Sequence, residues 1–206
     1  TFTDANACSV SGNFNVSEPT KLISNFSFKD ILCFGANDGM AWVEPSGGIS
    51  PYSVDWLLGQ TTDTITGLAP GNTSVMVTDA NGCFTVDSAT ISEPIVLSMT
   101  ASLVNPSCFG GNDGSVNTVT SGGTGFKSFL WSTVPAQTSP SATGLTAGTY
   151  SITATDQNGC KIDSSFTLTD PSELVMDSIL ADSLLCNSDS NGIAEVFASG
   201  GSGTLT

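Results

Sequence analysis

Short stretches in which apolar and polar residues alternate recur along the chain, with turn-forming residues between them. In Thr149–Thr155, and again in Lys161–Thr169, most of the apolar residues stand two positions apart. A period of two is typical of a β-strand that buries one face. Asn158-Gly159 lies between these stretches, and Asn-Gly is a strong hairpin signal because both turn positions favour a positive φ. We therefore predict a hairpin at this point.

Further short strands are expected on the N-terminal side of this hairpin. Val96–Val104, Ser115–Thr120 and Phe126–Trp131 are each followed by a glycine-rich or polar segment. After Trp131 we expect a polar loop and then a turn over Gly144–Gly148. Many short strands with a turn roughly every eight to twelve residues indicate a β-sandwich or a barrel.

The same landmarks return along the sequence at a nearly constant interval. Thr78–Cys83 returns as Thr155–Cys160, 77 residues later, and a looser copy, Thr3–Cys8, precedes it by 75 residues. Cys33–Gly39 returns as Cys108–Gly114, again after 75 residues. The same spacing relates Gly47-Gly48 to Gly122-Gly123 and Gly200-Gly201, Trp56 to Trp131, Gly67-Leu68 to Gly144-Leu145, and Glu18-Pro19 to Glu93-Pro94 and Asp170-Pro171. The chain is therefore an array of one repeat of about 75 residues.

This period divides the chain into four segments. Residues 1–19 are expected to hold the last strands of one module, 20–94 and 95–171 two full modules, and 172–206 the opening strands of a fourth. A module of this length can just support its own core, with help from cross-links or neighbours. Because the chain opens within a motif, we interpret it as a piece of a longer polypeptide.

Aromatic residues refine the expected fold. Trp56 and Trp131 stand mid-strand, where an immunoglobulin-like sandwich keeps its core tryptophan, and Tyr150 follows a glycine turn, where such folds often carry a tyrosine corner. Thr73 replaces this tyrosine in the first full repeat, and Trp42 is interpreted as local packing. We expect the core to account for most aromatic side chains. The prediction is an all-β chain of tandem immunoglobulin-like β-sandwich modules arranged end to end.

Charge narrows the range of partners. The 206 residues include 19 acidic side chains, 4 Lys or Arg and no His, for a formal net charge of −15. Nucleic acid is not expected as a partner, because phosphate neutralisation needs clustered basic residues. The negative field repels anionic membrane surfaces and attracts divalent cations. No run of about eighteen apolar residues occurs, so no membrane insertion by this segment is expected.

Catalysis is not expected either. Nucleophilic catalysis would need a base such as His, which the chain lacks. The Gly-Gly pairs recur with the module and fit turns better than a phosphate-binding loop. Residue types alone leave a glycosidase with paired carboxylates open. Carboxylates placed identically in each repeat, however, indicate structural roles, and we predict that the chain is not an enzyme.

The six cysteines occur two per repeat and indicate disulfides. Four-cysteine zinc sites use paired Cys-x-x-Cys knuckles, and the sequence has none. Structural disulfides in an oxidising compartment are the better interpretation. The residues concerned are Cys8, Cys33, Cys83, Cys108, Cys160 and Cys186.

Two pairings of these cysteines are open. The first and last strands of an immunoglobulin-like module run parallel, so the two cysteines of one module are expected at opposite ends, farther apart than the roughly 7 Å that a disulfide permits. The preferred hypothesis is therefore an inter-module bridge, Cys33–Cys160, with the other four cysteines paired to modules partly or wholly outside the chain. The alternative is pairing within a module, Cys33–Cys83 and Cys108–Cys160.

The acidic residues also allow two readings. If modules stack, Asp38, Glu93 and Asp156 are candidates to converge at a junction, and oxygen ligands from several loops suit calcium. The alternative is that Asp79 and Asp156 only cap an Asn-Gly turn and that Asp38 and Asp113 only start a turn. None of these stretches is a full calcium-loop signature. Calcium is therefore a hypothesis, and no other cofactor is expected.

Taken together, the landmarks resemble the SprB-type repeat of Bacteroidota surface proteins. That pattern runs Cys-x-Gly-x-x-Asp-Gly, Gly-Gly-Thr-x-x-Tyr-x-x-x-Trp, Gly-Leu-x-x-Gly-x-Tyr and Val-Thr-Asp-x-Asn-Gly-Cys, and it covers nearly the whole chain. The departures are Ala7 for the turn glycine, Thr73 for Tyr, Asn191 for Asp, and Phe126 near the usual Tyr. The resemblance implies a very long adhesin, exported by type IX secretion, displayed on the cell surface through other parts of the protein, and in the best-known members moved during gliding.

Four tripeptides resemble the Bacteroidota O-glycosylation pattern, Asp followed by Ser or Thr and then an aliphatic residue. So short a pattern also recurs by chance. The hydroxyl residues concerned are Thr64, Ser88, Ser178 and Ser183.

Three functions remain. The favoured one is a structural repeat segment of a cell-surface adhesin or filament that spaces or carries adhesive contacts to the substratum, in gliding motility, with neighbouring repeats as its partners. The alternatives are an array of glycan-binding modules and the accessory stalk of a secreted enzyme.

Overall fold

The computed structural model describes residues 1–182, 190 and 192–203. Within these residues, its regular secondary structure consists of β-strands. The chain divides into two compact units. Unit 1 comprises Thr1–Ile31 and Gly35–Glu93, and unit 2 comprises Leu32–Phe34 and Pro94–Thr206. No helix that could cross a membrane is found in the described part of the chain.

Unit 1 is a sandwich of two three-stranded antiparallel sheets. One sheet has the order β3-β4-β6, and the other has the order β5-β7-β8. Between them lies a core that includes Ala41, Trp56, Val75, Val77 and Ile91. The strands are β3 (Ser27–Lys29), β4 (Gly39–Trp42), β5 (Ser53–Trp56), β6 (Thr64–Leu68), β7 (Gly71–Thr78) and β8 (Phe84–Ile91).

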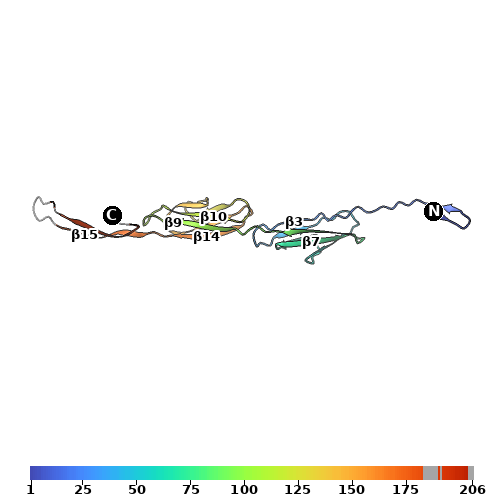
Figure 1. Ribbon diagram of the computed structural model, residues 1–206, viewed down its shortest axis with the longest axis horizontal. Coiled ribbons are helices and arrows are strands. Elements are labelled where there is room, and N and C mark those ends of the chain that lie inside the picture. Colours follow the sequence, from blue (N-terminus) through green and yellow to red (C-terminus); the bar gives the residue numbers. More distant parts are fainter. Residues whose placement is uncertain (183–189, 191, 204–206) are drawn as a thin grey trace. The chain divides into compact units, whose positions relative to one another are not determined.

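Unit 2 repeats this plan (Figure 1). Its sheets are β9-β10-β12 and β11-β13-β14, with Val116, Trp131, Ile152 and Leu168 in the core. In both units the strand order matches sheets A-B-E and C-F-G of the immunoglobulin fold. The predicted fold class is therefore confirmed. The strands are β9 (Ser98–Val104), β10 (Gly114–Ser121), β11 (Ser128–Trp131), β12 (Ser141–Leu145), β13 (Gly148–Thr155) and β14 (Lys161–Leu168).

Two further hairpins involve the terminal parts of the chain. One pairs β1 (Phe2–Thr3) with β2 (Ser9–Val10), and the other pairs β15 (Ser172–Ala181) with β16 (Ala194–Gly201). Their places in the repeat correspond to the last two and the first two strands of a module. The finer division into four segments stays a prediction.

The alternating stretches form strands, and the core tryptophans lie where the sequence places them. β13 and β14 pair from Gly148↔Leu168 to Thr155↔Lys161, around the predicted hairpin turn. Trp56 and Trp131 are buried, and their indole N–H groups donate to the carbonyls of Thr62 and Ser139.

The tyrosine corner forms in unit 2. The Tyr150 hydroxyl donates to the Thr146 carbonyl at 3.0 Å. At the equivalent position in unit 1, the buried Thr73 hydroxyl has no hydrogen-bond partner among the described residues.

The polar loop expected after Trp131 is partly wrong, because Ser141–Leu145 is strand β12. The pairs Gly114↔Leu145 and Ser115↔Thr143 leave Gly144 as an extra residue, with φ of 69°. This β-bulge shifts the strand's inward positions, so that Ala142 and Leu145 are buried three residues apart. A glycine expected to mark a turn therefore lies within a strand, and the alternation that would have revealed the strand is broken. Gly67, with φ of 73°, is the extra residue of an equivalent β-bulge in β6.

Candidate functional site

The β13–β14 hairpin carries a cysteine on a turn that is fixed by a buried carboxylate. Asp156 Oδ1 accepts hydrogen bonds from the backbone N–H groups of Asn158 and Cys160, each at 2.9 Å. Its Oδ2 accepts from the Thr124 N–H at 2.7 Å. Burial acts to raise the pKa of Asp156, but these three donors and the charge of Lys127 outweigh it and hold the pKa below its ordinary value. The carboxylate is therefore charged at neutral pH and holds Cys160 in place.

The same turn recurs in the other copies of the repeat. Asp79 Oδ1 accepts from Asn81 and Cys83, and its Oδ2 from Ile49. Its pKa is likewise lowered, since backbone donors outweigh the raising effect of burial. Asp4 accepts from the Asn6 and Cys8 N–H groups. The turn-capping interpretation of Asp79 and Asp156 therefore describes what these residues do.

The second cysteine of each repeat lies on a loop that the end of the last strand holds. In unit 1 the Gly35 N–H donates to Glu93 Oε2 at 2.8 Å, and the Ser92 N–H donates to Asp30 Oδ1 at 2.7 Å. In unit 2 the Gly110 N–H donates to Asp170 Oδ2, and the Thr169 N–H to Asn105 Oδ1. The sequence analysis did not predict this pair of hydrogen bonds in each unit, which we call the clamp. The sequence features that could have predicted the clamp are the acidic residue before each proline and the Asp or Asn three residues before each loop cysteine.

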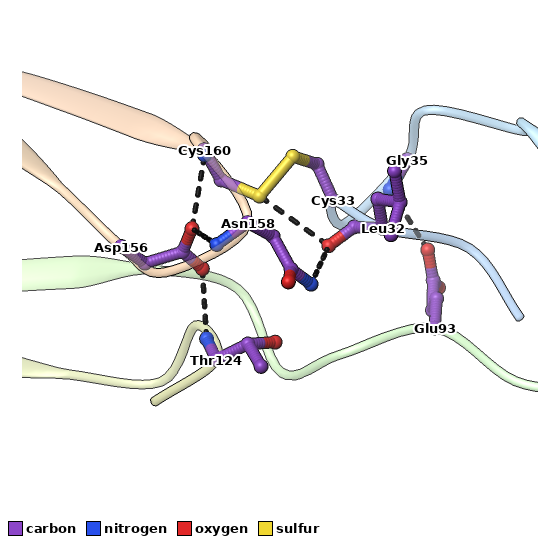
Figure 2. Close-up of a disulfide and its surroundings, with 8 residues drawn as sticks. All are labelled: Leu32, Cys33, Gly35, Glu93, Thr124, Asp156, Asn158 and Cys160. Carbon is purple, nitrogen blue, oxygen red and sulfur yellow. Dashed lines mark hydrogen bonds between the residues drawn. A yellow bond between two sulfur atoms is a disulfide. The ribbon is translucent and has the colours of Figure 1, made fainter. Parts of the chain in front are cut away.

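Cys33 and Cys160 form a disulfide (Figure 2). Their Cα atoms are 5.6 Å apart, and the bond closes a loop across a sequence separation of 127 residues. Asn158 Nδ2 donates to the Leu32 carbonyl at 2.9 Å. Cys160 Sγ lies 3.4 Å from the same oxygen, a van der Waals contact because a disulfide sulfur carries no hydrogen. This bond is the pair that the sequence analysis preferred, and it explains why Leu32–Phe34 group with unit 2 although they lie in the first full repeat.

The other cysteines are left unpaired in the described part of the chain. Cys8, Cys83 and Cys108 are exposed thiols. Cys186 lies outside the described residues. The intramodule pairs Cys33–Cys83 and Cys108–Cys160 are not formed here, because Cys33 and Cys160 bond each other.

The calcium hypothesis joins residues of both units, Asp38 and Glu93 of unit 1 and Asp156 of unit 2. Among the described residues, no group of three or more acidic, His or Cys side chains is placed to hold a metal ion. Glu93 accepts the Gly35 N–H of its cysteine loop, and Asp156 accepts backbone N–H groups of its cysteine turn. Asp38 lies half-buried before β4. Calcium binding by Asp38, Glu93 and Asp156 stays a prediction.

The candidate glycosylation residues lie on strands. Thr64 in β6, Ser88 in β8 and Ser178 in β15 are exposed. Ser183 lies outside the described residues. Their modification stays a prediction.

The expectation that the core holds most aromatic side chains is wrong for phenylalanine. Phe34 and Phe109, each next to a loop cysteine, are both 56% exposed, and Phe84 and Phe126 are more exposed still. They lie in loops or at strand ends, where alternation does not report which way a side chain points.

Comparison with known families identifies the repeat. Residues 25–61 and 100–136 both match the family model described as SprB repeat. The resemblance drawn from the sequence is therefore confirmed over these two segments, which follow one another in tandem. No curated protein matches the chain.

Several solved structures are similar at low identity. The C-terminal 282-residue fragment of intimin, in complex with the intimin-binding domain of the translocated intimin receptor, has 19% identity and a TM-score of 0.44, covering 78% of this chain and 67% of that one. Sidekick-1 immunoglobulin domains 1–5 give 11% and 0.39, covering 90% and 46%. A tetra-tandem repeat in the extending region of a large adhesion protein gives 13% and 0.29, covering 87% and 63%. The fold assignment stands on the sheet topology of the two units.

Proposed function

We propose that this chain is a structural repeat segment of a long cell-surface adhesin or filament, which spaces or carries adhesive contacts to the substratum and works in gliding motility. The two SprB repeats support the assignment to a surface array. Repeats that contact mainly their neighbours form arrays whose reach grows with copy number.

The observation that carries this proposal is the disulfide between residues of consecutive repeats. In the predicted division Cys33 belongs to the first full repeat and Cys160 to the second, so the bond would provide a covalent path between them in addition to the backbone. A segment that transmits tension between a cell and a surface benefits from such a path, because the backbone between the two cysteines is relieved of load.

The disulfide also supports an extracellular location. Structural disulfides persist in oxidising environments and are rare in the cytosol. We place the chain outside the cell, exported by type IX secretion and attached to the outer membrane through other parts of the protein.

The test uses cells of the source organism. Antibodies against the chain should label intact cells, and an in-frame deletion of residues 20–171 should reduce attachment to glass and gliding speed. Labelling that requires permeabilised cells, or unchanged attachment and gliding, would contradict the proposal.

A second function, glycan binding, is favoured by the exposed phenylalanines. Sugar-binding surfaces commonly present aromatic rings, and Phe34 and Phe109 occupy equivalent exposed positions in the two repeats. A glycan array probed with the full chain separates the two functions, since a spacer binds no glycan. Binding that Phe109→Ala abolishes and Val134→Ala, a matched exposed apolar control, leaves unchanged would favour the glycan-binding function.

A further inference from the structure

Both halves of the Cys33–Cys160 bond occur again elsewhere in the chain, unbonded. The turn that presents Cys83 has the carboxylate contacts of the Cys160 turn, with Asp79 in place of Asp156. The loop that presents Cys108 has the clamp of the Cys33 loop, with Asp170 in place of Glu93. Both thiols are free and exposed. Each half is therefore shaped before any bond forms.

A hollow of about 340 Å³ lies beside Cys83 in unit 1. Its lining includes Glu18, Lys21, Leu22, Gly48, Asp79 and Cys83. In unit 2 the residue equivalent to Cys83 is Cys160, and there the segment Leu32–Phe34 is bound, with the Leu32 carbonyl accepting from the side chain of Asn158. Asn81 is the equivalent of Asn158, and its backbone N–H donates to Asp79 Oδ1 as that of Asn158 donates to Asp156 Oδ1.

We propose that the surface around Cys83 is a docking site for the Cys108–Gly110 loop of another copy of this repeat, and that the two cysteines form a disulfide equivalent to Cys33–Cys160. The Asn81 side chain would donate to the carbonyl of Ser107, the counterpart of Leu32. This inference deepens the proposed function, because it extends one cross-link into a continuous series of cross-links between repeats.

The chemistry needs an oxidant, and a low-molecular-weight disulfide such as oxidised glutathione supplies it. The Cys83 thiolate attacks glutathione disulfide, forming a mixed disulfide and releasing one glutathione thiolate. The Cys108 thiolate of the second copy then attacks the Cys83 sulfur, and a second glutathione thiolate leaves. Two cysteine thiols are thus oxidised to one disulfide while one glutathione disulfide is reduced to two thiols, and the leaving thiolates take up the two protons.

The test measures the proportions of the disulfide dimers that form between two single-thiol variants. In a full chain carrying Cys8→Ser and Cys186→Ser, one variant adds Cys83→Ser and the other adds Cys108→Ser. The two are mixed in equal amounts with oxidised glutathione, and non-reducing peptide mapping counts the three possible disulfide dimers. Random pairing makes the Cys83–Cys108 dimer half of the total. Docking should enrich it about tenfold relative to the symmetric dimers, since a hydrogen bond and the packing of the loop favour it.

A positioning variant completes the test. Asn81→Ala should return the dimers toward the random ratio while leaving the rate of mixed-disulfide formation with glutathione at Cys83 unchanged. Random pairing in the parent variants, or enrichment that Asn81→Ala does not reduce, would overturn the docking site. The assay uses purified chains and measures only which cysteines become bonded. Either of these two results would therefore leave the attachment and gliding tests of the proposed function unaffected.

Discussion

The disulfide should limit how far the chain can be stretched. In a chain pulled by its two ends, tension passes from residue 33 to residue 160 through the sulfur atoms, and the 127-residue loop between them carries none. Strands β4 to β13 lie inside this loop. Even when both units unfold, these strands cannot add to the end-to-end length.

The magnitude follows from the length of the loop. An extended chain spans at most about 3.3–3.6 Å per residue, so reduction of the bond should release roughly 430 Å of additional contour length. The assay is single-molecule force spectroscopy with handles at both ends of the full chain, before and after dithiothreitol. The double variant Cys33→Ser/Cys160→Ser should show the longer length without reductant. Cys83→Ser/Cys108→Ser, the matched control, should behave as the parent chain, because those thiols are unbonded.

Two results would refute this reasoning. Equal contour lengths with and without dithiothreitol would mean that no bond crosses the array. A gain of only about 170 Å per reduced bond would match a loop of about 50 residues, which is the length closed by pairing within a module. The measurement thus distinguishes the two pairings that the sequence left open.

Three further predictions concern the stability of the units. Thr73→Val should stabilise unit 1 by about 1 kcal/mol, because it removes a buried hydroxyl that has no hydrogen-bond partner among the described residues. Amide hydrogen exchange in β7 should then be slower, and faster exchange would contradict the prediction. Gly122→Ala should destabilise unit 2 by about 3 kcal/mol, because residue 122 has a φ of 71° and an added Cβ would lie 2.0 Å from the Val96 carbonyl oxygen. Calorimetry should show a far smaller loss of stability for the control Gly159→Ala, whose added Cβ would meet no atom within 4 Å. Asp156 has a folded-state pKa below its unfolded value, so its stabilisation is complete above about pH 4 and is lost as pH falls through the folded pKa. Asp156→Asn should therefore be less stable than the parent at pH 7 in urea unfolding, and this difference should shrink below pH 4; a constant difference would contradict the assignment.

Much of the fold could be predicted from particular residues. The return of Cys33–Gly39 and of Thr78–Cys83 at a constant interval identified the repeat, because equivalent positions in equivalent modules meet the same constraints. The alternation around Asn158-Gly159 located the last hairpin, since a two-residue period and an Asn-Gly turn both act over a few neighbouring residues. Trp131 could be placed in the core because a tryptophan, Trp56, recurs at the equivalent position of the other full repeat.

Strand β12 and the carboxylate contacts could not be predicted in this way. Gly144 reads as a turn residue along the chain, and only its pairing with β10 reveals a bulge. Glu93 reads as a candidate metal ligand, and only the folded loop shows that its oxygen accepts from the Gly35 N–H. Both depend on partners distant in sequence, which local pattern does not specify.

By itself, then, the sequence determined the repeat, the strand-rich sandwich and the short list of cysteine pairings, because these follow from periodicity and from the geometry of neighbouring residues. The tertiary structure decided that Cys33 bonds Cys160, that Glu93 and Asp156 accept backbone amides, and that Phe34 and Phe109 face solvent. Those outcomes depend on which groups, far apart along the chain, come within a few ångströms of each other when the sheets pack.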